Sequence, residues 1–261
     1  MTPVRIVAAG DAALVAEFDE RIDVSVNAQV LALAGQLGLA AVPGVHDIVP
    51  TFRSVAVHFD PLATDVGDLA ARIHAASASA LELPADGRSV RLPPSPKLRR
   101  TAEALADAGQ AHGIGSEDPV EIPVCYDAEF ALDLGEVARA AGLSRDDAIA
   151  AHAGRDYRVF MIGFLPGFAY LGSVDARIAA PRRAEPRLAV PAGAVGIAGL
   201  QTGIYPQQSP GGWNIVGRTP LRMAWLDRPR PTRLKAGDMV RFRAIDRSEF
   251  DRIVAEEGPA A

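Results

Sequence analysis

The apolar and polar positions of residues 1–83 predict a small α+β domain. Apolar residues recur at helical spacing from Asp23 to Gly38, and Thr64 or Asp65 is suited to cap a second helix. Four short apolar stretches predict strands: Val4–Ala8, Ala13–Phe18, Val45–Val49 and Ser54–Phe59. The order β-β-α-β-β-α indicates two helices packed on one face of a small sheet.

Residues 84–118 interrupt this pattern and predict a partly mobile linker. Prolines break regular structure at its start, and glycines loosen the chain near its end. The segment is longer than the usual connection between elements. Its basic run, Lys97 to Arg100, has two interpretations, a solvated helix face or a docking site.

Residues 119–250 predict a second, β-rich domain. A strand is expected at Val120–Cys125, followed by helices at Asp133–Ala141 and from Ser144 to His152, where Ser144 begins a capping box. Short apolar stretches then alternate with Gly/Pro clusters, and they lie at Val159–Ile162, Leu188–Val190, Val195–Ala198, Trp213–Val216, Leu221–Trp225 and Met239–Phe242. This pattern predicts a β-barrel or sandwich, with residues 251–261 as a tail.

Composition narrows the function classes. The 261 residues carry a net charge of -5, which argues against a nucleic-acid surface. The single cysteine, Cys125, excludes an intrachain disulfide and fits a reducing compartment. The N-terminus does not resemble a signal peptide, and no apolar run is long enough to cross a bilayer. We therefore expect a cytoplasmic protein without a membrane partner.

Three Gly/Pro-rich segments are candidates for a substrate site: 163–171, 186–199 and 201–220. Glycine allows close approach of the backbone to a ligand, proline stiffens the loops, and the interleaved aromatic and polar side chains can hold a small substrate. The alternative is that the glycines mark barrel corners. The candidate binding residues are Phe164, Pro166, Gly167, Phe168, Tyr170, Gly193, Gln201, Thr202, Gly203, Tyr205, Ser209, Gly211, Gly212 and Trp213.

Three further residues are candidates for catalysis. Arg187 and Arg218 can hold a carboxylate or phosphate through a bidentate fork, or they can form structural salt bridges. His152 can act as a general base, or it can be a hydrogen-bonded histidine at a helix end. Backbone N–H groups between Gly193 and Gly199, or at Gly211 and Gly212, are candidates for an oxyanion hole.

The motifs that would mark a self-sufficient nucleotide or metal site are absent from the sequence. It contains no P-loop, no dinucleotide fingerprint after a strand, no H-E-x-x-H and no C-x-x-C. We therefore expect no metal site in this chain, and we expect a different chain to handle the phosphates if ATP is used.

The same segments resemble the signatures of the KipI family, which includes allophanate hydrolase subunit 1 and the B subunit of 5-oxoprolinase. The resemblance rests on the run from Met161 to Leu171, the run from Val190 to Pro206, and Ser209-Pro-Gly-Gly-Trp with the later Gly217-Arg-Thr-Pro. Gly44 to Pro50 and Ile122 to Tyr126 also fit. The chain departs from the family pattern at Ala194 and Leu200, where the family often has Ser and Asn.

This resemblance implies a small N-terminal α+β domain and a cyclophilin-like β-barrel. It also implies an ATP-dependent 5-oxoprolinase that converts 5-oxo-L-proline to L-glutamate. In such an enzyme the chain would act with two partners, a KipA-like and a LamB/YcsF-like subunit. It would share ATP with them and would be inactive alone.

Two alternatives remain open at the level of sequence. Some family members inhibit a histidine kinase, which would make this chain a protein-binding module. A role in an allophanate hydrolase or urea carboxylase pathway would require biotin on a partner, because no biotin-carrier sequence is present here.

Overall fold

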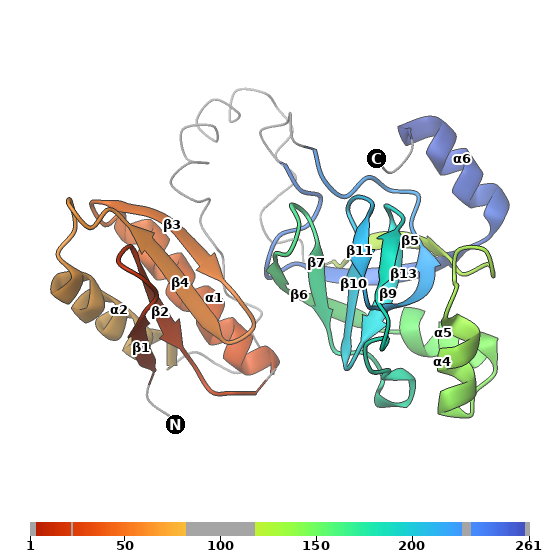
Figure 1. Ribbon diagram of the computed structural model, residues 1–261, viewed down its shortest axis with the longest axis horizontal. Coiled ribbons are helices and arrows are strands. Elements are labelled where there is room, and N and C mark those ends of the chain that lie inside the picture. Colours follow the sequence, from red (N-terminus) through yellow and green to blue (C-terminus); the bar gives the residue numbers. More distant parts are fainter. Residues whose placement is uncertain (1–3, 22, 82–117, 226–230, 259–261) are drawn as a thin grey trace. The chain divides into compact units, whose positions relative to one another are not determined.

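The computed structural model describes residues 4–21, 23–81, 118–225 and 231–258 (Figure 1). The chain divides into two compact units, residues 1–116 and 117–261. The predicted linker lies outside the described residues except for Asp118, and so does its basic run. Within the described part, no helix is long and apolar enough to cross a membrane.

The first unit is a four-stranded antiparallel sheet with two helices, as the sequence predicted. Its strands are β1 (Arg5–Ala8), β2 (Ala13–Glu17), β3 (Val45–Pro50) and β4 (Ser54–Phe59), in the order β1-β2-β4-β3. Its helices are α1 (Val24–Ala40) and α2 (Val66–Leu81). Alternate strand residues such as Leu14, Val55 and Val57 pack with Val30 and Ile73 of the helices, which gives the unit its own hydrophobic core.

The second unit contains a closed seven-stranded barrel, β10-β7-β6-β13-β5-β12-β9 (Figure 1). Its strands are β5 (Val120–Cys125), β6 (Asp156–Ile162), β7 (Ala169–Gly172), β9 (Ala194–Ala198), β10 (Gln201–Ile204), β12 (Asn214–Arg218) and β13 (Met239–Ile245). Only β5 and β13 pair in parallel; the other neighbours are antiparallel. Closure leaves the barrel without an exposed edge strand.

Helices cover parts of this barrel. α4 (Leu134–Ala141) and α5 (Arg145–Ala153) contribute Leu134, Val137 and Ala148 to the core that fills the barrel interior. Ser144 caps α5 as the sequence predicted, because its side chain accepts a hydrogen bond from the N–H of Asp147. A 3-10 turn, η1 (Ala176–Ile178), adds Ile178 to the same core.

One expected strand of the second domain lies outside the barrel, and another is wrong. Leu188–Val190 lies in β8 (Arg187–Val190), which pairs with β11 (Ser209–Gly211) in a separate two-stranded sheet. Leu221–Trp225 forms no strand, only an isolated bridge from Ala224 to Thr232. Conversely, the Gly/Pro-rich segments supply barrel strands β7 and β10, because a glycine in a strand permits close packing on its neighbours.

The predicted tail is also wrong where it is described, because residues 251–257 belong to α6 (Arg247–Glu257). Asp246 caps this helix by accepting a hydrogen bond from the N–H of Glu249. Phe250 then packs on Cys125 of β5 and lies against the tilted ring of Phe130, which anchors the helix to the barrel.

Candidate functional site

Five predicted aromatic residues gather on the outer face of the barrel. Phe168 lies at the centre, and its ring centroid is 5.6 Å from that of Phe164, 4.7 Å from Tyr170, 5.0 Å from Tyr205 and 5.5 Å from Trp213. Most of these pairs meet edge to face, a favourable geometry for aromatic rings. We call these five residues the aromatic cluster.

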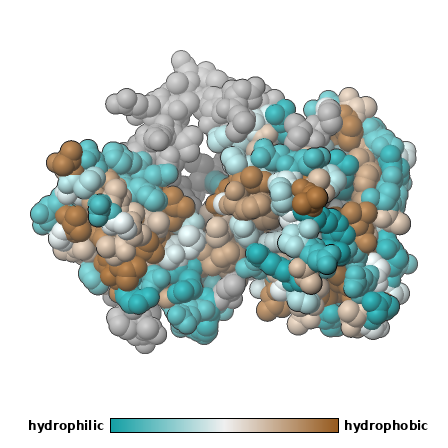
Figure 2. Space-filling model, viewed as in Figure 1, coloured by the Kyte–Doolittle hydropathy of each residue, from teal (hydrophilic) through white to brown (hydrophobic). Residues whose placement is uncertain are grey.

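Two predicted glycines make this packing possible. A Cβ atom on Gly203 would lie 3.1 Å from both the Phe168 and the Trp213 rings, and a Cβ atom on Gly211 would overlap the Tyr205 hydroxyl. Figure 2 shows hydrophobic residues reaching the surface of this unit near the ends of β7 and β10. Both glycines are strand residues, and the aromatic cluster can pack as it does only because neither carries a side chain.

Phe164 is the exposed member of the aromatic cluster. Its side chain is 63% exposed, and its backbone has φ +67°, a left-handed conformation that is unfavourable for any residue with a Cβ. The loop that holds it is closed by hydrogen bonds from Gly163 N–H to Phe168 O and from Phe168 N–H to Leu165 O. Strained backbone of this kind clusters at functional sites, so Phe164 is a candidate ligand contact.

The aromatic cluster offers two hydroxyl groups, that of its member Tyr205 and that of the neighbouring Ser209. Ser209 stands opposite Val190, which packs in the same hydrophobic cluster as Phe168 and Tyr205. The Ser209 residue is 8% exposed, and its Oγ has no hydrogen-bond partner among the described residues. Burial raises the pKa of Tyr205 to about 12, so its hydroxyl stays protonated and can donate a hydrogen bond. A buried hydroxyl without a partner is unfavourable unless a ligand or water completes it.

Arg218 lies on the same outer face, because β12 places it opposite Ala194, which packs in the same hydrophobic cluster as Phe168. Its Nε donates to Ala192 O at 2.9 Å, and its guanidinium carbon lies 5.6 Å from the centre of the Phe130 ring. Partial burial lowers its pKa, yet an arginine keeps its charge. No carboxylate of the described residues pairs with it, which leaves a half-buried cation available for an anion.

Arg187 instead forms the structural salt bridge that the sequence left as an alternative. Its Nη1 and Nη2 donate to the two carboxylate oxygens of Asp133 at 2.8 and 2.7 Å. Asp133 is 3% exposed and also accepts from Arg183 Nη1 and from the N–H of Ile215, at 2.8 and 2.6 Å. The fork of Arg187 is therefore occupied, and the pair ties β8 to the barrel.

His152 lies inside the barrel and not in the aromatic cluster. The hydroxyl of Thr202 donates to Gly196 O at 3.0 Å, so its oxygen accepts from His152 Nε2–H at 2.9 Å. Nδ1 then accepts from the hydroxyl of Tyr126 at 2.8 Å, and the ring stacks on Phe242. Burial lowers the pKa of His152 to about 3. A neutral histidine with both nitrogens bonded is a structural one, and Thr202 belongs with it.

The remaining candidates fall into three groups. Pro166 and Gly167 shape the Phe164 loop, where Gly167 has φ +85°. Gln201 is half-buried at the start of β10, and Gly212 accepts a backbone hydrogen bond from Arg183 N–H. The N–H groups of Gly193 and Gly199 donate to Tyr205 O and Ala180 O, so they are not free to form an oxyanion hole.

The sequence interpretation did not identify Asp133 as the anchor of this face. Asp133 was predicted only as the start of a helix, and its partners Arg183 and Arg187 lie about 50 residues further along the chain, with bonds of 2.7 and 2.8 Å. No local pattern connects them. An aspartate at a helix start followed later by several arginines was the one available indication.

Known proteins resemble this chain over most of its length. Residues 4–234 match the family described as carboxyltransferase domain, subdomain C and D. The B subunit of 5-oxoprolinase from Bacillus subtilis (strain 168) is 39% identical over 241 residues, which is 92% of each chain. The B subunit of 5-oxoprolinase from Escherichia coli O157:H7 is 49% identical over 123 residues, which is 47% of this chain and 56% of that one.

A solved structure gives the same result for the fold. The crystal structure of TTHA0988 superposes with a TM-score of 0.69 and 34% identity, covering 90% of this chain. This chain spans only 40% of the length of that protein. From the matched range and the identity to its relatives, the chain belongs to the carboxyltransferase-domain family, subdomain C and D, that includes the B subunits of bacterial 5-oxoprolinases.

Proposed function

We propose that this chain is a subunit of an ATP-dependent 5-oxoprolinase that hydrolyses 5-oxo-L-proline to L-glutamate. The observation that carries the proposal is 39% identity, over 92% of both chains, to a protein named as the B subunit of 5-oxoprolinase. That name designates one of several subunits. We therefore expect partners, a KipA-like and a LamB/YcsF-like subunit, with no turnover by this chain alone.

The outer face of the barrel fits the chemistry of this substrate. 5-Oxoproline has a small flat ring, a lactam amide and a carboxylate. In the proposal, Arg218 holds the carboxylate, the rings of Phe164 and Phe168 cover the apolar edge, and the hydroxyls of Tyr205 and Ser209 position the lactam. Among the described residues, the charge of Arg218 has no carboxylate partner and Ser209 Oγ has no hydrogen bond, which supports this arrangement.

The geometry favours a different role for three residues that the sequence offered for the site. Arg187 is neutralised by Asp133, so it supports the β8–β11 sheet on which Ser209 stands. His152 and Thr202 are bonded to each other inside the barrel. We propose that none of the three contacts the substrate.

ATP would activate the lactam by phosphoryl transfer, but two of the glycines that the sequence offered for an anion do not fit a phosphate cradle. The N–H groups of Gly193 and Gly199 already donate to carbonyl oxygens at 2.8 and 2.6 Å. No step that involves ATP is therefore assigned to this chain, and we propose that one of its partners binds the nucleotide.

The test is an assay of 5-oxoproline-dependent ATP hydrolysis and glutamate release. The full chain is assayed alone and then with its KipA-like and LamB/YcsF-like partners, and we expect activity only in the mixture. Arg218→Gln should lower kcat/KM by about 100-fold, because a charge-assisted contact to the substrate is lost. Arg222→Gln is the matched control, since the Arg222 Nε also donates to a backbone carbonyl at 2.9 Å.

The two parts of the proposal fail separately. An inactive mixture of folded subunits would overturn the 5-oxoprolinase assignment and would favour another amide substrate or the kinase-inhibitor interpretation. An active mixture in which Arg218→Gln behaves like Arg222→Gln would leave the activity in place and refute the site on the outer face.

A further inference from the structure

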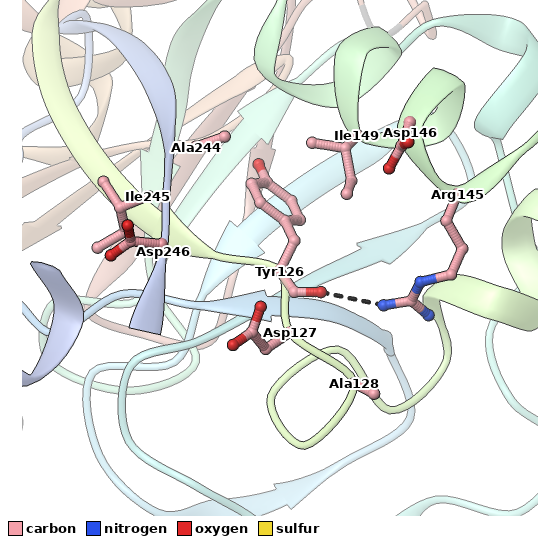
Figure 3. Close-up of a pocket in the computed structure, with 9 residues that line it drawn as sticks. All are labelled: Tyr126, Asp127, Ala128, Arg145, Asp146, Ile149, Ala244, Ile245 and Asp246. Atoms are coloured by element: carbon pink, nitrogen blue, oxygen red, sulfur yellow. Dashed lines mark hydrogen bonds between the residues drawn. The ribbon is translucent and has the colours of Figure 1, made fainter. Parts of the chain in front are cut away.

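A concave site lies apart from the aromatic cluster. Its volume is about 520 Å³, within the range of small-molecule sites, and none of its lining residues belongs to the aromatic cluster (Figure 3). It is formed where the parallel strands β5 and β13 end and where α5 begins. We call it the β5–β13 pocket.

Four charged side chains line the β5–β13 pocket. They are one guanidinium, Arg145, and three carboxylates, Asp127, Asp146 and Asp246. Among the described residues, no ion pair within 4.0 Å involves any of the four, although the second unit contains many other arginine–carboxylate pairs. Opposite charges that share a pocket without meeting leave room for a ligand that joins them.

Two of the three carboxylates lie away from Arg145, and the third, Asp146, lies beside it at the start of α5. Arg145 is fixed by a hydrogen bond from its Nη2 to Tyr126 O at 3.0 Å. Figure 3 shows the Arg145 guanidinium on one side, with the side chains of Asp127 and Asp246 away from it towards the other. Asp246 also caps α6 with one oxygen, which fixes its position.

The space between these charges has apolar walls. Tyr126, Ile149 and Ile245 line the same pocket. Tyr126 is held rigidly, because its hydroxyl donates to His152 inside the barrel. A ligand that fits this lining has a carboxylate, an ammonium group and a short apolar side chain.

We propose that the β5–β13 pocket binds a small neutral α-amino acid, with its carboxylate on Arg145 and its ammonium on Asp127. A guanidinium holds a carboxylate through two parallel hydrogen bonds, and an aspartate carboxylate accepts hydrogen bonds from an ammonium group. A metal ion fits less well, since the three carboxylates form no metal-binding group within the described residues and a cation would face Arg145. The proposal does not rest on the 5-oxoprolinase assignment.

The test uses L-valine and two analogues of the same shape, each lacking one charge. Isovalerate lacks the ammonium group, and isobutylamine lacks the carboxylate. Binding to the full chain is measured by calorimetry at low ionic strength, and we expect only L-valine to bind measurably. Arg145→Gln and Asp127→Asn should each weaken that binding by at least about tenfold, the effect of losing one charge-assisted contact.

Arg155→Gln is the matched control, because Arg155 also donates to a backbone carbonyl, Ser173 O, at 3.0 Å but does not line the pocket. It should bind L-valine as the unmodified chain does. Thermal unfolding of each variant shows whether the fold is intact. The proposal is overturned if L-valine does not bind, if isobutylamine binds equally well, or if a folded Arg145→Gln chain keeps full affinity.

Discussion

The inside of the barrel and its outer face use similar polar side chains in opposite ways. Inside, Tyr126, His152 and Thr202 form a chain of hydrogen bonds in which every group has a partner. Outside, Ser209 Oγ has no partner among the described residues, and Arg218 is a half-buried cation that none of their carboxylates neutralises. Both regions are packed on aromatic rings, so packing alone does not distinguish them.

The difference separates groups that stabilise the fold from groups that are candidates to bind a ligand. A buried polar network that is fully satisfied holds one arrangement of the core. A buried group without a partner destabilises the protein, and its persistence is understandable where a ligand supplies the missing bond. Hydrogen-bond satisfaction therefore favours the outer face as the site and His152 as part of the scaffold.

The largest expected effect comes from breaking the anchor of the outer face. Asp133→Asn removes the charge that neutralises Arg183 and Arg187, and it leaves two partly buried cations unpaired. We expect a loss of about 3 kcal/mol or more in the free energy of unfolding, as for other broken buried ion pairs. Urea unfolding followed by tryptophan fluorescence measures it, because Trp213 and Trp225 both lie in the second unit.

Asp175→Asn is the matched control for this change. Asp175 also receives two hydrogen bonds from one arginine, Arg177, but that arginine is mostly exposed. Surface pairs contribute at most about 1 kcal/mol. If Asp133→Asn loses no more stability than Asp175→Asn, the buried pair does not anchor the outer face.

Most of the fold could be predicted from the sequence because periodicity and turn residues are local properties. The hairpins and helices of the first unit and the capping box at Ser144 were predicted correctly. Helix α6 was missed although its capping residues, Asp246 and Glu249, stand three positions apart as such residues usually do.

The candidate site could be predicted only in part because the face of a barrel residue depends on pairing across the sheet. The structure brings together the aromatic residues of two predicted segments, 164–170 and 205–213. Thr202 was placed with them although it points into the barrel, whereas Tyr205, three residues further along the chain, points out. Bulges at Val159/Met161 and Ile215/Gly217 shift the alternation further, and no pattern within one strand reveals them.

A drop in pH should weaken the inner network. The pKa of His152 is lowered from 6.5 to about 3 because burial disfavours its charged form. The unfolded chain therefore takes up a proton below about pH 6.5 that the folded chain does not, and stability is lost as the pH falls. Between pH 6.5 and 5 the loss should be about 1.6 kcal/mol, because the unfolded imidazole is already half protonated at pH 6.5 and the slope approaches about 1.4 kcal/mol per pH unit only below it.

The composition of the second unit makes this measurement specific. His152 is the only histidine in residues 117–261, so no other imidazole of that unit titrates in this range. Urea unfolding at several pH values, again followed by tryptophan fluorescence, gives the slope. An NMR titration of the imidazole provides a second readout: its C–H resonances should not shift between pH 7.5 and 5, and a midpoint near 6.5 would contradict a buried neutral His152.

The smallest effect separates the strain at Phe164 from the contribution of its ring. Phe164→Ala and Phe164→Gly both remove the ring, so both should raise the KM for 5-oxoproline in the assembled enzyme by similar factors. Only glycine also relieves the left-handed backbone, where φ is +67°. We therefore expect the glycine variant to be more stable than the alanine variant by about 1 kcal/mol.

Leu188 provides the control for this pair, because it is 91% exposed in β8 of the same unit and its φ is not positive. There the order should reverse, with Leu188→Gly less stable than Leu188→Ala, since glycine in a strand loses more chain entropy on folding. If glycine is also the less stable residue at 164, the loop is not strained. If both Phe164 variants keep the original KM, the exposed ring does not contact the substrate, and the outer face would bind it through Arg218 and the two hydroxyls alone.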